Sequence, residues 1–276
     1  MEDLLNTEYE LIPINDLINI FSQSINGHTR PRLNNFSSEG FFRARKINGV
    51  SEKELGKAES IWYPDWNKIE RKYHTYNRCS NKGENFFYSS NSLEAVISEM
   101  NPKHGDKLLI GIFKLAKPGM AFLAQLAGIE RLRMTLECQS ALKDYKFQTE
   151  KDRGFEDLIS NFYTRRVSKE SDYKPSIAFT KMLLKNEDYK CLIYPSVAAD
   201  YRFVNFGIKP EFVDNCLRCR GAYIYNVERT EESITLEPDR FTIRVYENSN
   251  EPKNSKFEWK KNTNEEKKMW AKKYCL

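Results

Sequence analysis

The chain has 276 residues, 40% of them hydrophobic and 30% charged, and a mean hydropathy of −0.69. This composition is typical of a globular protein with its own core, and no stretch approaches the roughly 20 apolar residues of a membrane-spanning helix. The net charge is +5, of which residues 251–276 carry +4, so the basic character belongs to the C-terminal end and argues against direct nucleic-acid binding.

The first third of the chain is predicted to hold one helix, one strand and long irregular segments. Apolar residues at helical spacing over 14–21 predict an amphipathic lead-in helix that begins near Asn15. Residues 22–38 are rich in Ser, Asn and Gly, which predicts a loop. Residues 41–45 predict a strand with two arginines on one face, and residues 48–85 show too little periodicity for more than loop.

A short strand followed by a helix is predicted next. Residues 86–89 are mostly aromatic and suit a strand, and apolar side chains then share one helix face over residues 93–100. Asn91 and Glu94 have the spacing of a capping pair at the start of that helix. The apolar residues 107–115 predict a further strand.

Helices are predicted for the middle third of the chain and strands for the last third. Over residues 121–185, apolar side chains repeat at helical spacing from 122 to 132 and again from 155 to 162. Strand patterns return over residues 191–194, 202–206, 222–227, 233–236 and 240–246. A helical layer inserted between mixed strands, without a regular alternation of strand and helix, predicts an α+β fold with a mixed β-sheet core.

The N-terminus and the cysteines indicate a reducing, cytoplasmic location. Acidic residues follow Met1 where a signal peptide needs a basic start. The six cysteines are scattered through the chain, so we expect free thiols. Cys216 and Cys219 have the spacing of a zinc-ligand pair, but no second Cys or His pair is near them in sequence, so no metal site is predicted.

The sequence lacks several familiar catalytic motifs. It has no G-x-G-x-x-G or G-x-x-x-x-G-K-[ST] phosphate loop, no H-E-x-x-H zinc motif and no G-x-S-x-G nucleophile elbow. Three histidines leave little for histidine-based catalysis. A set of polar residues at the edges of predicted strands and helices remains: Arg43, Arg78, Tyr88, Glu99 and Ser196.

These residues belong to an ordered pattern that resembles the RES domain family, which is named for its Arg, Glu and Ser. The matching pieces are Phe42-Arg43, the run from Asn77 to Gly83, Phe87 to Ser90 with Glu94, Ala95 and Glu99 after it, Ile193 to Val197, and Asn205-Phe206. Tyr88 and Glu99 are 11 residues apart, as in the family, and the match covers about residues 40–210. Cys79 stands where the family has an aromatic residue, and the gap from Glu99 to Ser196 leaves room for extra helices.

The resemblance implies a bacterial toxin of a toxin–antitoxin pair, with a fold similar to that of ADP-ribosylating toxins such as diphtheria toxin. It implies that NAD⁺ is the substrate, with no separate cofactor. The expected reaction is cleavage of the nicotinamide–ribose bond by a glycohydrolase or phosphorylase, which depletes cellular NAD⁺. The alternative within the family is transfer of ADP-ribose to a protein. The implied partner is a helix-turn-helix antitoxin of the Xre type.

The residue types suit this chemistry. Loss of nicotinamide leaves an oxocarbenium-like ribose, whose charge the Glu99 carboxylate can stabilise. Arg43 and Arg78 offer forked donors to the diphosphate, Tyr88 offers a flat face to the nicotinamide ring, and Ser196 can orient the ribose. We therefore expect Glu99, Arg43 and Ser196 to be catalytic, and Arg43, Arg78, Tyr88 and Ser196 to bind NAD⁺.

Ordinary structural roles are the alternative for each of these residues. The two arginines could be surface charges, Tyr88 a half-buried strand residue, and Ser196 a turn residue after a proline. Glu99 lies about 110° from the centre of the apolar stripe of its helix, which favours exposure.

The sequence predicts three parts. Residues 1–35 form a lead-in helix and loop, residues 36–225 the RES-type catalytic domain, and residues 226–276 C-terminal strands and a basic tail of the same globule. A second class of function is a nucleic-acid or protein binding module that uses this tail, in which Phe257, Trp259 and Trp270 stand among lysines. We expect instead a partly helical end anchored by these aromatic residues.

Overall fold

The computed structural model describes residues 8–25 and 32–275, which form two compact units. Unit 1 contains the described residues up to 36 together with residues 64–87 and 121–209, and unit 2 contains residues 37–63, 88–120 and 210–275. Both units combine helices and strands, which confirms the predicted α+β class. No helix in the described part of the chain is long and apolar enough to cross a membrane.

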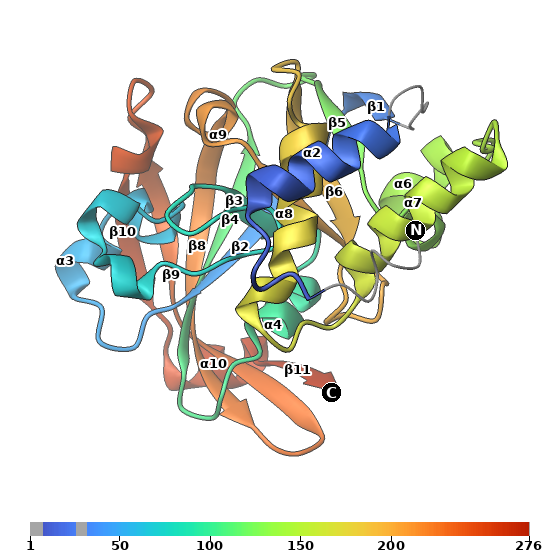
Figure 1. Cartoon of the computed structure of the whole chain (residues 1–276). Coiled ribbons are helices and arrows are strands. Elements are labelled where there is room, and N and C mark those ends of the chain that lie inside the picture. The colour runs from blue at the N-terminus through green and yellow to red at the C-terminus, as the bar shows by residue number, and fades with distance from the viewer. Residues whose placement is uncertain (1–7, 26–31, 276) are drawn as a thin grey trace. The chain divides into compact units, whose positions relative to one another are not determined.

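Unit 1 holds a mixed sheet in the order β1-β5-β6-β7, of which Figure 1 labels β1, β5 and β6. Its strands are β1 (Arg32–Phe36), β5 (Phe122–Leu126), β6 (Tyr189–Pro195) and β7 (Val204–Ile208). β5 runs parallel to β6, and the other two pairs are antiparallel. Two parallel neighbours need a long crossover connection, and a series of helices supplies it here.

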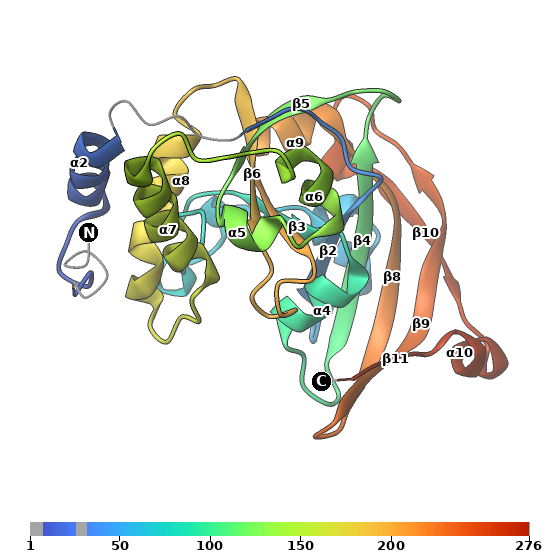
Figure 2. The ribbon, with the colours of Figure 1, turned by 90° about the vertical axis from the view of Figure 1, so that its right-hand side faces the viewer.

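The helices of unit 1 pack through aromatic rings. They are α2 (Ile14–Ile25), α5 (Ile129–Leu132), α6 (Leu136–Leu142), α7 (Glu150–Thr164) and α8 (Lys174–Leu183). Figure 2 shows α2, α7 and α8 side by side, and both α2 and α7 contact α8. The rings of Phe21 and Phe179 stack with centroids 4.2 Å apart, and Phe162 lies 5.9 Å from Phe179. The predicted lead-in helix is thus confirmed and belongs to the core of this unit.

Two predictions in this unit are wrong. The segment 122–132, predicted as one helix, begins with β5, and the predicted loop 22–38 contains β1. β5 is buried along most of its length because it lies between β1 and β6, and such a strand shows a continuous apolar run without the alternation that identifies a strand in sequence. β1 is a polar edge strand in which only Phe36 is buried.

Unit 2 is an antiparallel sheet in the order β3-β2-β4-β8-β9-β10. The strands are β2 (Phe41–Lys46), β3 (Phe87–Ser90), β4 (Lys107–Leu115), β8 (Leu217–Arg229), β9 (Ser233–Tyr246) and β10 (Lys256–Lys261), and β11 (Lys272–Cys275) also pairs with β9. Its helices are α3 (Glu52–Leu55), α4 (Leu93–Met100), α9 (Pro210–Cys216) and α10 (Asn264–Trp270). The predicted strands 41–45, 86–89 and 107–115 and the helix 93–100 are confirmed within a residue or two.

Short 3-10 helices occupy parts of the connections. They are η1 (Ala58–Ile61), η2 (Trp66–Lys68), η3 (Arg71–Tyr73), η4 (Glu170–Tyr173) and η5 (Pro252–Asn254). The segment 48–85 therefore holds α3 and three of these turns within otherwise irregular chain, close to the predicted loop. The predicted cap of α4 is shifted by one residue, since Ser92 is the N-cap and its hydroxyl accepts the backbone N–H of Glu94 at 3.2 Å.

The C-terminal region completes the outer edge of the unit 2 sheet. β10 pairs with the second half of β9, and β11 pairs with the first half. The two strands predicted at 233–236 and 240–246 are one strand, interrupted by a bulge at Asp239 that follows Pro238. The tail is thus largely β-structure with one short helix. Phe257 is buried as expected of an anchor, and the side chain of Trp270 lies outside the described residues.

The two faces of this sheet pack differently. On one face, α4 lies against β2, and Ile97 joins a core cluster with Leu108, Ile110, Tyr225, Val227, Ile234 and Leu236. On the other face, Ile61 of η1 and Phe113 pack over Gly111 of β4. We call these the α4 face and the η1 face.

Gly111 sets how closely η1 approaches the sheet. A Cβ atom at this position would lie 2.9 Å from side-chain atoms of both Ile61 and Phe113, which are fully buried. We expect Gly111→Ala to lower the free energy of unfolding by about 1–3 kcal/mol in chemical denaturation, because an extra methyl group overpacks the core.

Gly40→Ala is the matched control for this prediction. A Cβ at Gly40 would meet only the carbonyl oxygen of Phe113 at 3.7 Å, an ordinary contact. Gly40→Ala should change the free energy of unfolding by no more than about 1 kcal/mol. Equal losses in both variants would contradict the close packing at Gly111.

Candidate functional site

The structure places the predicted site residues in both units. Arg43, Tyr88 and Glu99 belong to unit 2, and Arg78 and Ser196 belong to unit 1. Three of the predicted residues therefore share one unit, and they come from β2, β3 and α4.

The guanidinium of Arg43 ties β2 to two other segments of unit 2. Its Nε donates to the carbonyl oxygen of Ile61 at 3.0 Å, and its Nη1 donates to that of Tyr88 at 2.8 Å. Burial lowers the pKa of Arg43 to about 10, with Arg45 acting in the same direction and Tyr88 opposing it. The group remains cationic at neutral pH. A buried guanidinium with carbonyl partners stabilises the contacts between these segments.

Tyr88 and Arg43 meet through the backbone. β2 pairs with β3 at Phe42 and Ser90, so the alternation of side chains puts Tyr88 on the α4 face with Phe42. Arg43 lies one residue from Phe42 and projects to the η1 face. The arginine consequently contacts the carbonyl of Tyr88, and the half-buried ring belongs to the opposite face of the sheet.

Glu99 lies in the last turn of α4 and is exposed. Ala95, Val96 and Ile97 form the buried side of this short helix. The exposure agrees with the position of Glu99 beside the apolar stripe. A carboxylate at this position does not carry the energetic cost of burial.

Arg78 of unit 1 binds the C-terminal end of α7. Its Nη1 donates to the carbonyl of Phe162 at 2.9 Å and its Nη2 to that of Arg165 at 3.4 Å, and the guanidinium lies 5.4 Å from the ring centroid of Tyr173. A cation is favourable at a helix C-terminus because the last carbonyls lack partners within the helix. Arg78 therefore has a structural role whether or not it also binds a ligand.

Ser196 begins a tight turn after β6 and is fully buried. Its N–H donates to the carbonyl of Phe203 at 2.9 Å, and its carbonyl accepts from Tyr201 at 2.8 Å. Asp200 and Tyr201 both have positive φ, at 49° and 62°. Residues other than glycine adopt this conformation at some energetic cost, and such strain concentrates at functional sites.

A buried carboxylate beneath this turn was missed by the sequence analysis. Glu156 of α7 is only 4% exposed, and its Oε1 accepts the N–H of Gly128 at 3.3 Å. Gly128 has φ +81°, and a Cβ there would lie 3.1 Å from Pro195, the residue before Ser196. No local pattern signals this burial, because Glu156 lies about 110° from the centre of the apolar stripe of its helix, which Phe155, Leu158, Ile159 and Phe162 form.

We expect Glu156 to support the Pro195–Ser196 turn through Gly128. Glu156→Ala leaves a buried N–H without its acceptor and should lower the free energy of unfolding by about 1–3 kcal/mol. Glu156→Gln keeps an oxygen at the same position, so the loss in free energy of unfolding should be smaller than for Glu156→Ala. Chemical denaturation followed by circular dichroism measures both values, and an equal loss in the two variants would contradict the hydrogen bond as the cause.

The buried cysteines are poor nucleophiles. Burial raises the pKa of Cys79 and of Cys219 to about 12, and it raises the pKa of Cys191 well above its usual value. Cys216 is half-buried. In the described part of the chain, no group of three or more His, Cys, Asp and Glu residues is placed to hold a metal ion.

We predict that a thiol-specific disulfide reagent labels the native protein at Cys216 and not at these three thiols or at Cys138, which is also buried. A thiol with a pKa of about 12 is ionised in about 1 molecule in 10⁴ at pH 8, and the fraction rises with pH. The experiment uses Cys275→Ser, which removes the thiol whose side chain is not described. Adding Cys216→Ser should abolish rapid labelling until denaturant is added. Rapid labelling of Cys79 at pH 8 would contradict the burial.

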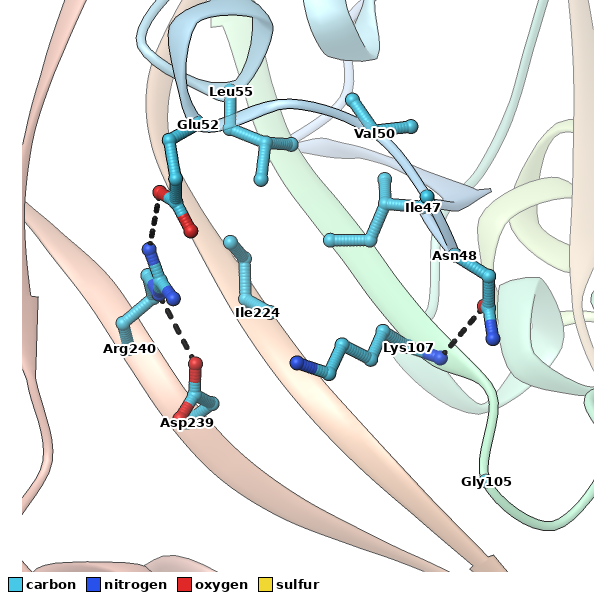
Figure 3. A pocket seen from close by; sticks show the side chains of 11 residues that line it. Ile47, Asn48, Val50, Glu52, Leu55, Gly105, Lys107, Ile224, Asp239 and Arg240 are labelled. Atoms are coloured by element: carbon cyan, nitrogen blue, oxygen red, sulfur yellow. Dashed lines mark hydrogen bonds and ion pairs between the residues drawn. The ribbon is translucent and has the colours of Figure 1, made fainter.

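Unit 2 contains further concave sites among its described residues. One, of about 680 Å³, is lined by Asn101, Lys103, His104, Arg229, Thr230 and Glu231. A second, of about 250 Å³, has an apolar floor that includes Ile47, Leu55 and Ile224. In this second site, Figure 3 shows Arg240 between two carboxylates, with Nη1 2.7 Å from Glu52 and Nε 3.0 Å from Asp239. These charges compensate one another, so the second site offers little to a charged ligand. A third site, of about 480 Å³, lies on the α4 face and is lined by aromatic side chains, and we call it the aromatic pocket.

Comparison with known proteins does not assign the chain to a family. No family model matches it, and no curated protein is significantly similar to it in sequence. The evidence for function is therefore the ordered residue pattern and the geometry of the described residues.

Proposed function

We propose that this protein cleaves the nicotinamide–ribose bond of NAD⁺ and is a toxin of the RES type with an ADP-ribosyltransferase-like fold. The supporting observation is the hydrogen bond from Arg43 to the carbonyl of Tyr88. It joins the arginine of the pattern to the tyrosine of the pattern across 45 residues of chain. α4 then continues from β3 to Glu99 within the same unit.

The reaction needs little beyond a carboxylate and a well-oriented ribose. The bond between C1′ of the ribose and the ring nitrogen breaks, its electron pair leaves with neutral nicotinamide, and positive charge develops on the sugar. The Glu99 carboxylate stabilises this charge. Water then adds to C1′ and loses a proton to give ADP-ribose, or phosphate adds to give the 1-phosphorylated product. Attack by a protein side chain is the transferase alternative.

The arginines have a more complex role than diphosphate binding alone. Arg43 and Arg78 each donate to two backbone carbonyls, in addition to the diphosphate binding that is proposed for each of them. Replacing either arginine by alanine would therefore change both stability and the KM for NAD⁺. A substitution of the exposed Glu99 is a clearer test of the proposal, because a change in activity there is not combined with the loss of buried contacts.

The partner proposed for the toxin is a helix-turn-helix antitoxin. The alternative, a nucleic-acid binding tail, has weaker support because its lysines are partly neutralised. Lys267 lies 3.5 Å from carboxylate oxygens of both Glu237 and Asp239, and Lys260 lies 3.5 Å from that of Glu266. Charges already paired contribute less to phosphate binding.

We expect Glu99→Gln to fold like the parent and to lose at least ~100-fold in kcat for nicotinamide release, because the amide cannot stabilise the developing positive charge. Glu228→Gln, at an exposed acid on β8, is the matched control and should keep full activity. Release of nicotinamide is measured by chromatography, with the melting temperature of each variant as a check on folding.

Two outcomes would contradict the proposal. One is unchanged NAD⁺ consumption by Glu99→Gln. The other is the absence of nicotinamide release by the parent at any enzyme concentration, together with salt-sensitive binding of DNA or RNA. Mass spectrometry of the products, with and without phosphate, separates hydrolysis, phosphorolysis and protein modification.

A further inference from the structure

The aromatic pocket on the α4 face of unit 2 has the properties of a small-molecule site. Its volume is about 480 Å³, within the range of about 300–1,000 Å³ common for such sites. Its walls come from β2, β4, β8, β9 and α4, which are held by the antiparallel sheet and the core cluster of the α4 face. The lining in the described part of the chain is Phe42, Leu93, Ile110, Ile112, Tyr223, Tyr225, Pro238, Phe241, Asn262, Glu266 and Lys272.

Aromatic rings in the pocket are nearly parallel. The Tyr223 ring lies 6.0 Å from that of Tyr225 with an angle of 25° between the planes, and 6.4 Å from that of Phe241 with an angle of 26°. Tyr225 is buried, whereas Tyr223 is 36% exposed. Neighbouring strands therefore present a set of aromatic rings in similar orientations, and part of the Tyr223 side chain is accessible to a ligand.

Polar groups line one side of the same pocket, and all come from the C-terminal region. The Glu266 carboxylate is held by the N–H of Thr263 at 2.8 Å and by Lys260 at 3.5 Å, as part of the capping box of α10. Asn262 is fixed by its N–H to the carbonyl of Asp239 at 2.9 Å. With Lys272, this side offers a hydrogen-bond acceptor that carries negative charge and a donor that carries positive charge.

We propose that this pocket binds a planar nitrogen heterocycle of the nucleobase class. The ring stacks on Tyr223 between the apolar walls, an exocyclic amino group donates to Glu266, and a ring nitrogen or carbonyl accepts from Lys272 or Asn262. A purely apolar ligand would make no hydrogen bond to these polar groups, and a phosphate alone would lie beside Glu266 and the aromatic rings.

This site is independent of the proposed NAD⁺ cleavage. The described lining includes none of Arg43, Arg78, Tyr88, Glu99 and Ser196. Adenine has no glycosidic bond, so its binding can be measured without any turnover. Failure of one proposal therefore leaves the other unaffected.

Isothermal titration calorimetry of the full chain with adenine tests the proposal, with ribose 5-phosphate as the comparison probe. We expect saturable binding of adenine and none of ribose 5-phosphate under the same conditions. Tyr223→Ala should weaken adenine binding at least 10-fold, since a stacked base loses its platform. Tyr223→Phe keeps the ring and should bind within about 3-fold of the parent.

Two further variants identify the polar side and control for the fold. Glu266→Gln keeps the capping box, which accepts Gln as well as Glu, and should weaken adenine binding at least 3-fold. Tyr246→Ala also removes an exposed tyrosine, but this residue lies in β9 and outside the pocket lining, so the affinity for adenine should not change. The proposal is overturned if adenine does not bind at millimolar concentration, if ribose 5-phosphate binds as well as adenine, or if Tyr246→Ala weakens binding as much as Tyr223→Ala.

Discussion

The close approach of η1 to the sheet over Gly111 is the constraint on which the predicted site of unit 2 depends. Gly111 pairs directly with Arg43 across the β2–β4 ladder, and Ile61 occupies the space that a side chain at 111 would fill. The carbonyl of Ile61 is then within reach of the Arg43 Nε. A residue without a side chain thus allows a buried cation to find its acceptor, and the same cation reaches the carbonyl of Tyr88.

Structural and chemical demands meet in the same residues. Arg43 and Arg78 each bind backbone carbonyls, one of Tyr88 in β3 and one at the end of α7. Such contacts fix a guanidinium in place, which is also what a ligand site requires, because an arginine already held in position loses less entropy on binding. The alternative of a purely structural role and the proposed role in binding NAD⁺ are therefore compatible for these two residues.

The C-terminal region is part of the unit 2 sheet and of one of its concave sites. Strands β10 and β11 pair along β9 and cover an edge that would otherwise expose unpaired backbone groups. The bulge at Asp239 adds to this, since Asp239 interacts with both Arg240 and Lys267. The same region supplies Asn262, Glu266 and Lys272 to the aromatic pocket. A segment whose composition indicated only a basic tail is thus integral to the sheet and to a concave site.

The sequence alone determined the elements whose pattern is local. Apolar and aromatic runs identified β2, β3 and β4, and helical spacing identified α2 and α4, because these signals lie within each segment. The order of Arg43, Tyr88 and Glu99 along these elements was equally visible. The angle of Glu99 from the apolar stripe of α4 correctly favoured its exposure.

Only the tertiary structure decided the features that depend on distant partners. β5 is a strand because β1 and β6 cover its two edges, although its residues also fit a helix. The carbonyl partners of Arg43 and Arg78 are 18 to 87 residues away in sequence, and no local pattern specifies them. The division into two units and the burial of Glu156 likewise arise from packing between segments that are far apart in the chain. The free energy of such packing depends on residues outside the local segment, so the local spacing of residues does not predict it.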